Sequence, residues 1–252
     1  MRPLLLLGLL VVPFLPIQAA SPSGDQILRQ MSDTLAAAKT FRFSATREID
    51  GALLGLDSGP LKARVAILVQ RPDRFAAVAE GKGGRREFIA DGRALTLFEA
   101  RPNFYSVVPM PATLDLLIAR LDEKFGFTPP LAEFALSNPY RELRKDATTV
   151  TWLGRATVGG GFLGIGGVLC DRLSLQGPHA DAELWIGVKD HLPRKLVATF
   201  KTFAEKPRLR VTFHHWDLAA KATPADFTFT PPKGAMKIEM WSVEKMRSAT
   251  TR

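Results

Sequence analysis

Alternation of apolar and polar residues is the feature that most constrains the fold of this chain. Phe41, Phe43 and Ala45 are apolar, and the residues between them are polar. Successive side chains of a strand point to opposite faces, so this pattern predicts a strand with one buried face. The turn signal Asp91-Gly92 joins two such segments into a predicted hairpin. We expect strands over residues 40–49, 61–70, 75–80, 86–90, 93–98, 103–108, 148–158, 168–176, 182–188, 192–203 and 208–216, and an extended piece near 236–241.

Two stretches change to a helical period. After Ser23, apolar residues recur at helical spacing as far as Leu35, and Gln26 forms a predicted capping box with Ser23. A second helix is expected after Thr113, and a short one after Pro130. The apolar faces of these helices should cover one face of the sheet. The sequence therefore predicts a mainly β, α+β fold, with one antiparallel sheet of roughly ten strands that curls around helices on its concave face.

The first residues have the layout of a secretory signal peptide. Arg2 gives a positive start, an apolar run extends from Leu4 to Ile17, and small residues follow up to Ala20. The run is shorter than the ~20 apolar residues that cross a bilayer, although an uncleaved anchor is the alternative. We expect cleavage near Ala20 or Ser21 and export from the cytoplasm. The predicted organisation is a signal peptide over residues 1–20, a single domain over 21–247 and a disordered tail over 248–252.

The cysteine content and the net charge indicate how the mature protein relates to the membrane and to other molecules. Cys170 is the only cysteine, so the chain forms no internal disulfide. A lipid anchor needs a cysteine directly after the cleavage site, and none lies there. The net charge is +9. A positive exported protein meets anionic lipid head groups rather than nucleic acid, so transient contact with a membrane surface is one interpretation. A well-solvated basic surface is the other, and the oligomeric state stays open.

The residues favour no enzyme and no cofactor. Residues 159–164 fit the pattern G-x-G-x-x-G, but a strand rather than a helix is expected to follow, which excludes a dinucleotide site. His214 and His215 are neighbours on an expected strand, where their side chains should point to opposite faces and not share a metal ion. No pair of carboxylates is placed for acid–base chemistry.

Apolar content is the more informative signal, because two expected strands are apolar on both faces. These are the runs at residues 65–69 and 184–186. Antiparallel sheets with a solvated face normally alternate. Two interpretations stay open: both faces are simply covered, or the curled sheet and its helices enclose an apolar cavity for a greasy ligand.

Several motifs carry a resemblance to a known family over roughly residues 25–240. They are RPDR (71–74), FIADGR (88–93), LF (97–98), LWI (184–186), LPRKL (192–196) and DFTFTPPKGA (226–235). With them the chain resembles the DUF2092 family of predicted periplasmic proteins, and the wider LolA/LolB-like superfamily of lipoprotein carriers. The resemblance implies an unclosed antiparallel barrel with helices that plug an apolar cavity. Members carry or sense lipoproteins or lipids. In LolA an arginine of the cavity holds the plug closed, and the motifs do not assign that residue here.

The resulting hypothesis is a soluble periplasmic carrier or sensor of a lipid, acyl chain or lipoprotein. The alternative is a non-enzymatic interaction protein of the cell envelope with a packed core and a basic surface. If a cavity exists, its lining should come from alternate positions of the strands, because these share one face of the sheet. Leu117 and Leu121 lie one helical turn apart and should face the same cavity. The expected ligand-binding residues are Val65, Ile67, Val69, Leu95, Leu97, Phe104, Leu117, Leu121, Leu184, Ile186, Phe200 and Phe213.

Overall fold

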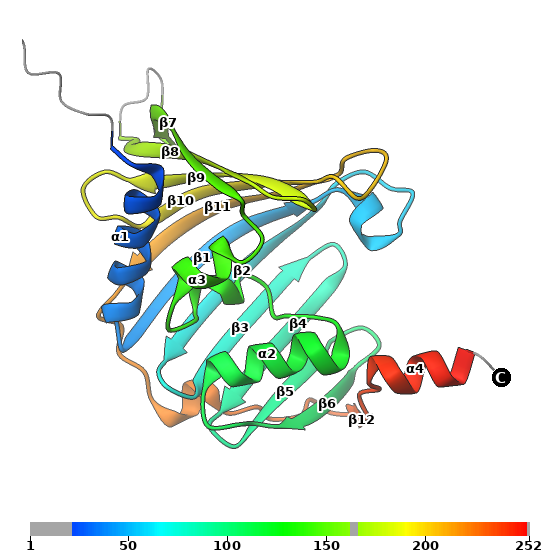
Figure 1. Ribbon diagram of the computed structural model, residues 1–252. Coiled ribbons are helices and arrows are strands. Elements are labelled where there is room, and N and C mark those ends of the chain that lie inside the picture. The colour runs from blue at the N-terminus through cyan, green and yellow to red at the C-terminus, as the bar shows by residue number, and fades with distance from the viewer. Residues whose placement is uncertain (1–21, 162–165, 251–252) are drawn as a thin grey trace, which may run out of the picture.

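The computed structural model describes residues 22–161 and 166–250, which form one curled sheet with helices on its concave side (Figure 1). The predicted signal peptide lies outside the described residues. The strands are β1 (Thr40–Ile49), β2 (Leu61–Gln70), β3 (Arg74–Gly81), β4 (Gly84–Asp91), β5 (Ala94–Glu99), β6 (Phe104–Pro109), β7 (Thr149–Val158), β8 (Val168–Gln176), β9 (Ala180–Gly187), β10 (Pro193–Phe200), β11 (Arg208–Asp217) and β12 (Met236–Lys237).

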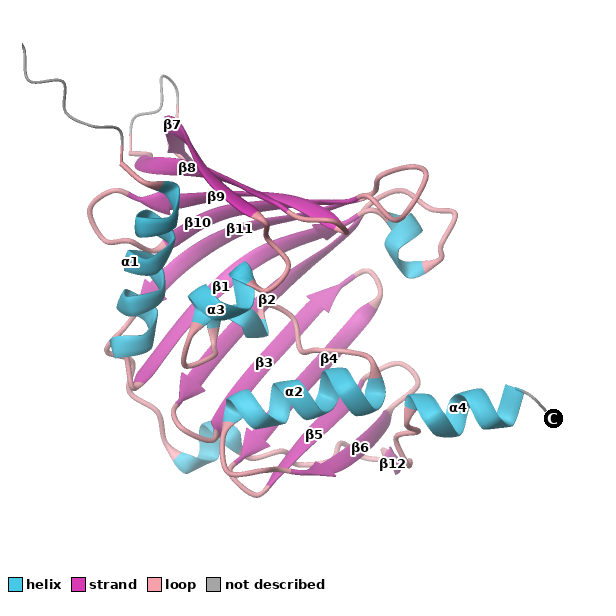
Figure 2. Cartoon of the chain, in the orientation of Figure 1, coloured by secondary structure: helices cyan, strands magenta, loops and turns pink. Residues whose placement is uncertain are grey.

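The sheet order is β12-β6-β5-β4-β3-β2-β1-β11-β10-β9-β8-β7. Neighbouring strands are antiparallel except for β12, which pairs with β6 in parallel. Because β12 and β7 are separate edges, the sheet curls without closing (Figure 2). The predicted fold class is therefore confirmed, with twelve strands in place of roughly ten.

The helices are α1 (Gly24–Ala37), α2 (Leu114–Phe125), α3 (Pro139–Arg144) and α4 (Val243–Thr250), with short 3-10 turns η1 (Gly51–Leu54), η2 (Ala132–Phe134) and η4 (Pro224–Phe227). The hydroxyl of Thr113 accepts a hydrogen bond from the Leu116 amide at the start of α2, and Asn138 caps α3 in the same way. α1, α2 and α3 lie on the concave side (Figure 2). Helix α4 includes residues 248–250, which the sequence analysis assigned to a disordered tail.

The start of α1 differs from the sequence prediction. Ser23 makes no side-chain capping hydrogen bond, so the expected capping box with Gln26 is wrong. The helix end is fixed by close packing instead. A Cβ atom on Gly24 would lie 2.9 Å from the backbone nitrogen of Trp152 in β7, which is nearer than real contacts allow. Glycine at this position therefore lets α1 begin directly against the edge strand.

The predicted hairpin at Asp91-Gly92 is confirmed by the pairing of β4 with β5. One carboxylate oxygen of Asp91 accepts hydrogen bonds from the amides of Arg93 (2.7 Å) and Ala94 (2.8 Å). Gly92 has φ +93°, a conformation that side chains with a Cβ avoid. Hydrogen bonds and a glycine within the turn itself therefore favour it, as the sequence predicts.

The core lies between the concave face and the helices. Fully buried members are Leu28 and Leu35 of α1, Phe41 of β1, Phe75 of β3 and Phe134 of η2. The packing of these side chains holds the helices on the sheet, because burial of apolar surface is the dominant favourable contribution to the free energy of folding.

A second apolar layer lies on the outer face of the sheet, over β3 and β4. Phe227 of η4 is buried, and η4 contacts β3 and β4 on their outer side. Phe229 packs against Phe98 and Tyr105, at ring-centroid distances of 5.4 and 5.5 Å. The chain after β11 therefore crosses the outer face before β12 joins the edge.

Candidate functional site

The concave face brings most of the sequence-predicted site residues together. Nine of the twelve belong to one apolar cluster, and Leu97 packs against that cluster while partly exposed. Phe104 on β6 and Phe200 on β10 are partly exposed and do not belong to it. The nine members are Val65, Ile67, Val69, Leu95, Leu117, Leu121, Leu184, Ile186 and Phe213.

A helical insert between β6 and β7, which contains α2, η2 and α3, fills the space in front of this face. Phe134 of η2 is fully buried, and its ring meets that of Phe213 edge-on, 4.9 Å between centroids. Leu131 and Ala135 are buried beside it in the same cluster. The predicted lining residues therefore contact protein side chains, and ligand binding by them stays a prediction.

Arg71 joins the insert to α1 at the turn after β2. Its Nη1 donates to the carbonyls of Leu35 (3.2 Å) and Ala38 (2.6 Å) at the end of α1. Its Nη2 donates to the carbonyls of Ala135 (3.1 Å) and Leu136 (2.6 Å) next to η2. The guanidinium also lies 5.0 Å from the centroid of the Phe41 ring. One side chain therefore holds two separate segments through four backbone oxygens.

The cost of placing Arg71 there is visible in its surroundings. Burial lowers the pKa of Arg71 from its ordinary value, and the nearby Asp115 partly opposes that shift. Its buried Nε has no hydrogen-bond partner among the described residues. An unpaired buried donor is costly, typically by about 1–3 kcal/mol. Sequence analysis missed the role of Arg71, and its place in the RPDR motif was the only signal available.

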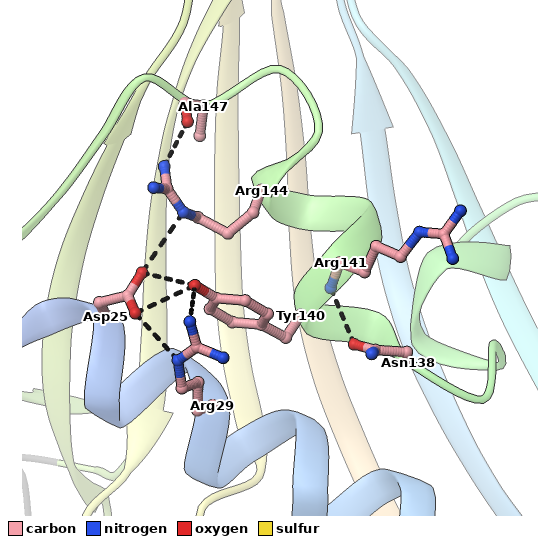
Figure 3. Close-up of polar contacts among 7 residues, drawn as sticks. All are labelled: Asp25, Arg29, Asn138, Tyr140, Arg141, Arg144 and Ala147. Carbon is pink, nitrogen blue, oxygen red and sulfur yellow. Dashed lines mark hydrogen bonds and ion pairs between the residues drawn. The ribbon is translucent and has the colours of Figure 1, made fainter.

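A second polar cluster ties α3 to the start of α1, and we call it the Asp25 cluster (Figure 3). The Tyr140 hydroxyl donates to the Asp25 carboxylate (2.8 Å), and Arg29 Nε donates to the same group (3.0 Å). Arg144 forms an ion pair with it at 3.3 Å. Desolvation raises the pKa of Asp25, but the hydrogen bonds and charges of Tyr140, Arg29 and Arg144 outweigh it and lower the pKa overall. Arg71 and the Asp25 cluster are thus two polar attachments of the insert to α1.

The open end of the concave face carries charge. Arg47 of β1 and Glu133 of η2 interact electrostatically across it, and both are half-buried. Desolvation raises the pKa of Glu133 to about 7, helped by Glu142 and opposed by Arg47. Arg47 also borders a cavity of about 180 Å³ at this end. Neither residue was among the sequence-predicted site residues, since a lone charge carries no distinctive signal, whether on an alternating strand, like Arg47, or in a short helical turn, like Glu133.

The expected arrangement of the two adjacent histidines is wrong. A β-bulge interrupts the pairing of β1 with β11, and His215 has a positive φ of 53°. The bulge lets both rings reach β1, with His215 Nδ1 3.0 Å from the Ser44 hydroxyl and His214 Nε2 3.4 Å from that of Thr46. In the described ranges, no group of three or more His, Cys, Asp or Glu side chains could hold a metal ion.

An unclosed, curled sheet whose concave apolar face is covered by a helical insert defines this class of protein. The chain belongs to the DUF2092 family, described as predicted periplasmic protein, whose model matches residues 24–241. A comparison with curated proteins finds no match. Of the helices within the described residues, none combines the length and apolar character needed to cross a bilayer.

Solved structures that are similar to this chain share little sequence with it. An uncharacterized conserved protein from Thermus thermophilus has 10% identity and a TM-score of 0.50, over 85% of this chain and 97% of that one. A LolA superfamily protein from Nitrosomonas europaea has 12% identity and a TM-score of 0.38, over 83% and 99%. A chain of the MucA/MucB complex of Pseudomonas aeruginosa has 13% identity and a TM-score of 0.44, over 82% and 61%. The likeness to the Thermus protein concerns the fold alone.

Proposed function

We propose that this protein is a non-enzymatic periplasmic carrier or sensor of a lipid, acyl chain or lipoprotein, which binds on the concave face when the insert moves away. The observation that carries the proposal is the way this face is covered. Its apolar surface is closed by the short segment around η2, whose Leu131, Phe134 and Ala135 are buried in the core. An acyl chain offers similar apolar volume, worth about 0.8 kcal/mol for each buried CH₂.

The contacts that attach the insert would allow the η2 segment to be replaced by an acyl chain. Arg71 holds the η2 segment through backbone carbonyls, and the Asp25 cluster holds α3 through partly exposed side chains. Exposed ion pairs contribute little, typically about 0–1 kcal/mol each. Replacement of Phe134 by an acyl chain would exchange one set of apolar contacts for another. The energetic cost of opening therefore lies mainly in a few polar contacts.

Export and release from the membrane are part of the same proposal. The family is described as predicted periplasmic, and the signal-like residues 1–20 precede the family match. Cys170, the only cysteine of the chain, is buried in β8, which supports a mature protein without a lipid anchor. We expect mature protein whose N-terminus lies near Ala20.

The second candidate function is an interaction protein with a permanently packed core. The full burial of Leu28, Val69, Leu121 and Phe134 in one cluster favours it, because the interior is closed as described. Its basic surface would then be the functional part. The two candidates differ in one property, which is whether the concave face accepts an acyl chain.

Substitution of Phe134 by alanine tests the proposal. The change removes the ring that plugs the face, so the variant should bind a fluorescent acyl probe more tightly than the wild type. Phe227→Ala is the matched control, since it also removes a buried phenylalanine but on the outer side of the sheet. It should bind the probe as the wild type does. Folding of both variants is checked by circular dichroism.

Two results together would contradict the proposal. Neither the folded wild type nor folded F134A would bind the probe, and native mass spectra of the periplasmic protein would show no lipid. The packed-core interaction protein would then be the better account.

A further inference from the structure

Arg47 is a cation at the open end of the concave face. It lies on β1, where its register partners are Ala63 of β2 and Val211 of β11. Neither partner can accept a hydrogen bond through its side chain. Among the described residues, no hydrogen bond or ion pair reaches the Arg47 guanidinium, although it is half-buried and burial lowers its pKa. A guanidinium that is partly removed from water gains strongly from an anionic partner.

The other cations around the same cavity already have partners. Lys62 is paired with Glu48 at 3.1 Å, and Arg85 with Glu87 at 2.6 Å. Arg86 is paired with Glu99. Arg47 therefore stands out as the basic group of this cavity that is free to bind a ligand.

The cavity itself combines an apolar wall with this charge. Its volume is about 180 Å³, and Ile49, Leu61, Ala63 and Ala79 line it beside Arg47. Leu54 of η1 also borders it and is 51% exposed. The cavity opens at the end of the concave face where β1 ends and β2 begins. An apolar chain along the face would thus have its end at Arg47.

Glu133 is the acidic group that faces Arg47 from the insert. Its pKa of about 7 means that it carries only part of a negative charge near neutral pH. It therefore balances Arg47 incompletely. Glu133 belongs to η2, and among the described residues of the insert it is the only negative charge that acts on Arg47. Movement of η2 would therefore also remove this negative charge from Arg47.

We infer that the cavity at Arg47 binds the anionic head group, a carboxylate or a phosphate, of an acyl-chain ligand, with Arg47 as its counter-ion. The inference rests on the proposed function and narrows its ligand class to anionic amphiphiles. A neutral lipid of the same chain length would leave the guanidinium unpaired. Discrimination between the two should therefore depend on this one side chain.

The test compares a polyene fatty acid, cis-parinaric acid, with its uncharged methyl ester, by fluorescence titration of the full-length mature protein. The wild type should bind the acid more tightly than the ester. Arg47→Gln should weaken binding of the acid by about 10-fold or more and leave the ester unchanged, as expected for loss of a charge-assisted hydrogen bond. Arg64→Gln is the matched control, because Arg64 is exposed on the opposite face of the neighbouring strand, across from Thr46. It should bind both probes as the wild type does.

Three results would overturn the inference. Equal affinity of R47Q and the wild type for the acid would exclude Arg47 as counter-ion, while ester binding would keep the carrier proposal intact. Displacement of the acid by acetate or inorganic phosphate, at constant ionic strength, would show a site for free anions instead of an amphiphile. Failure of both the folded wild type and folded F134A to bind either probe would overturn both the inference and the proposed function. Binding of the ester by R47Q shows that the variant is folded.

Discussion

Three polar side chains occupy unusual positions in this structure. Arg71 binds four carbonyls from two segments, Arg47 faces a cavity without a partner among the described residues, and Glu133 is held in a desolvated position. Each of these placements costs free energy. Such costs are commonly tolerated where the group serves a function, which makes these three residues the first targets for mutation.

The pKa of Glu133 predicts a dependence of stability on pH. An unfolded glutamate ionises near 4.5, whereas Glu133 in the folded protein stays protonated up to about pH 7, because desolvation disfavours its charge. The folded state therefore binds more protons between these values. The contribution of Glu133 to stability is fully present below pH 4.5 and is lost as the pH rises to about 7.

Glu133→Gln should remove this decline and make the variant more stable than the wild type at about pH 8, above the raised pKa. Thermal unfolding midpoints measured from acid to mildly basic pH check it. Glu123→Gln, an exposed change in the same insert, is the control and should follow the wild-type curve. Parallel curves for E133Q and the wild type would contradict the desolvated position of Glu133. Arg47 and Glu142, the charged groups that act on Glu133, are unchanged in both variants.

At the scale of elements, α3 is the part of the insert whose attachment is least apolar. α3 has one buried residue, Pro139, and its contacts with α1 include the Asp25 cluster. The amide of Tyr140 also donates to the Ser32 hydroxyl at 3.0 Å. By contrast, α2 buries Leu114, Leu117 and Leu121 against the sheet. We therefore expect α3 and η2, rather than α2, to open first.

Tyr140→Phe tests this order. The variant keeps the ring under Arg29 and loses the hydroxyl that donates to Asp25 and accepts from Arg29, which should cost about 1 kcal/mol. Amide hydrogen exchange should become faster in α3 and at the start of α1, while α2 stays unchanged. Arg141→Ala is the control, because only the backbone amide of Arg141 bonds Asn138 and its guanidinium points away from the Asp25 cluster (Figure 3). Uniform acceleration across all helices would argue against a locally attached insert.

At the scale of the whole molecule, two apolar layers of unequal size cover the sheet. The inner layer lies under the helices, and the outer one lies under the chain that follows β11. Phe227 is buried there with Ile89 and Phe98 of the outer face. On β9, which is far from this segment in the sheet order, Trp185 is covered instead by the cations of Arg172 and Lys195, 5.4 and 4.7 Å from its ring centroid.

Removal of the residues after Asp217 should expose the outer layer. Loss of Phe227 alone uncovers apolar area worth about 1.5–3 kcal/mol. The shortened protein should bind a hydrophobic dye and aggregate at temperatures at which the full chain does not. A control that lacks only the residues after Trp241 keeps η4 and β12, so it should behave like the full chain. Equal dye binding by the two truncated proteins would contradict the sealing role of the segment.

Local chemistry in the sequence determined the strands, the Asp91-Gly92 hairpin and the helix that begins after Thr113, because period-2 alternation and capping depend on residues a few positions apart. It also identified most of the apolar face, since alternate positions on paired strands share a side of the sheet. Only the tertiary structure decided how that face is covered. The carbonyls that Arg71 binds come from residues 35–38 and 135–136, the bulge at His215 depends on pairing with β1, and the parallel return of β12 depends on the path of the preceding segment. Contacts between residues so far apart in sequence arise from packing and desolvation, which no local pattern encodes.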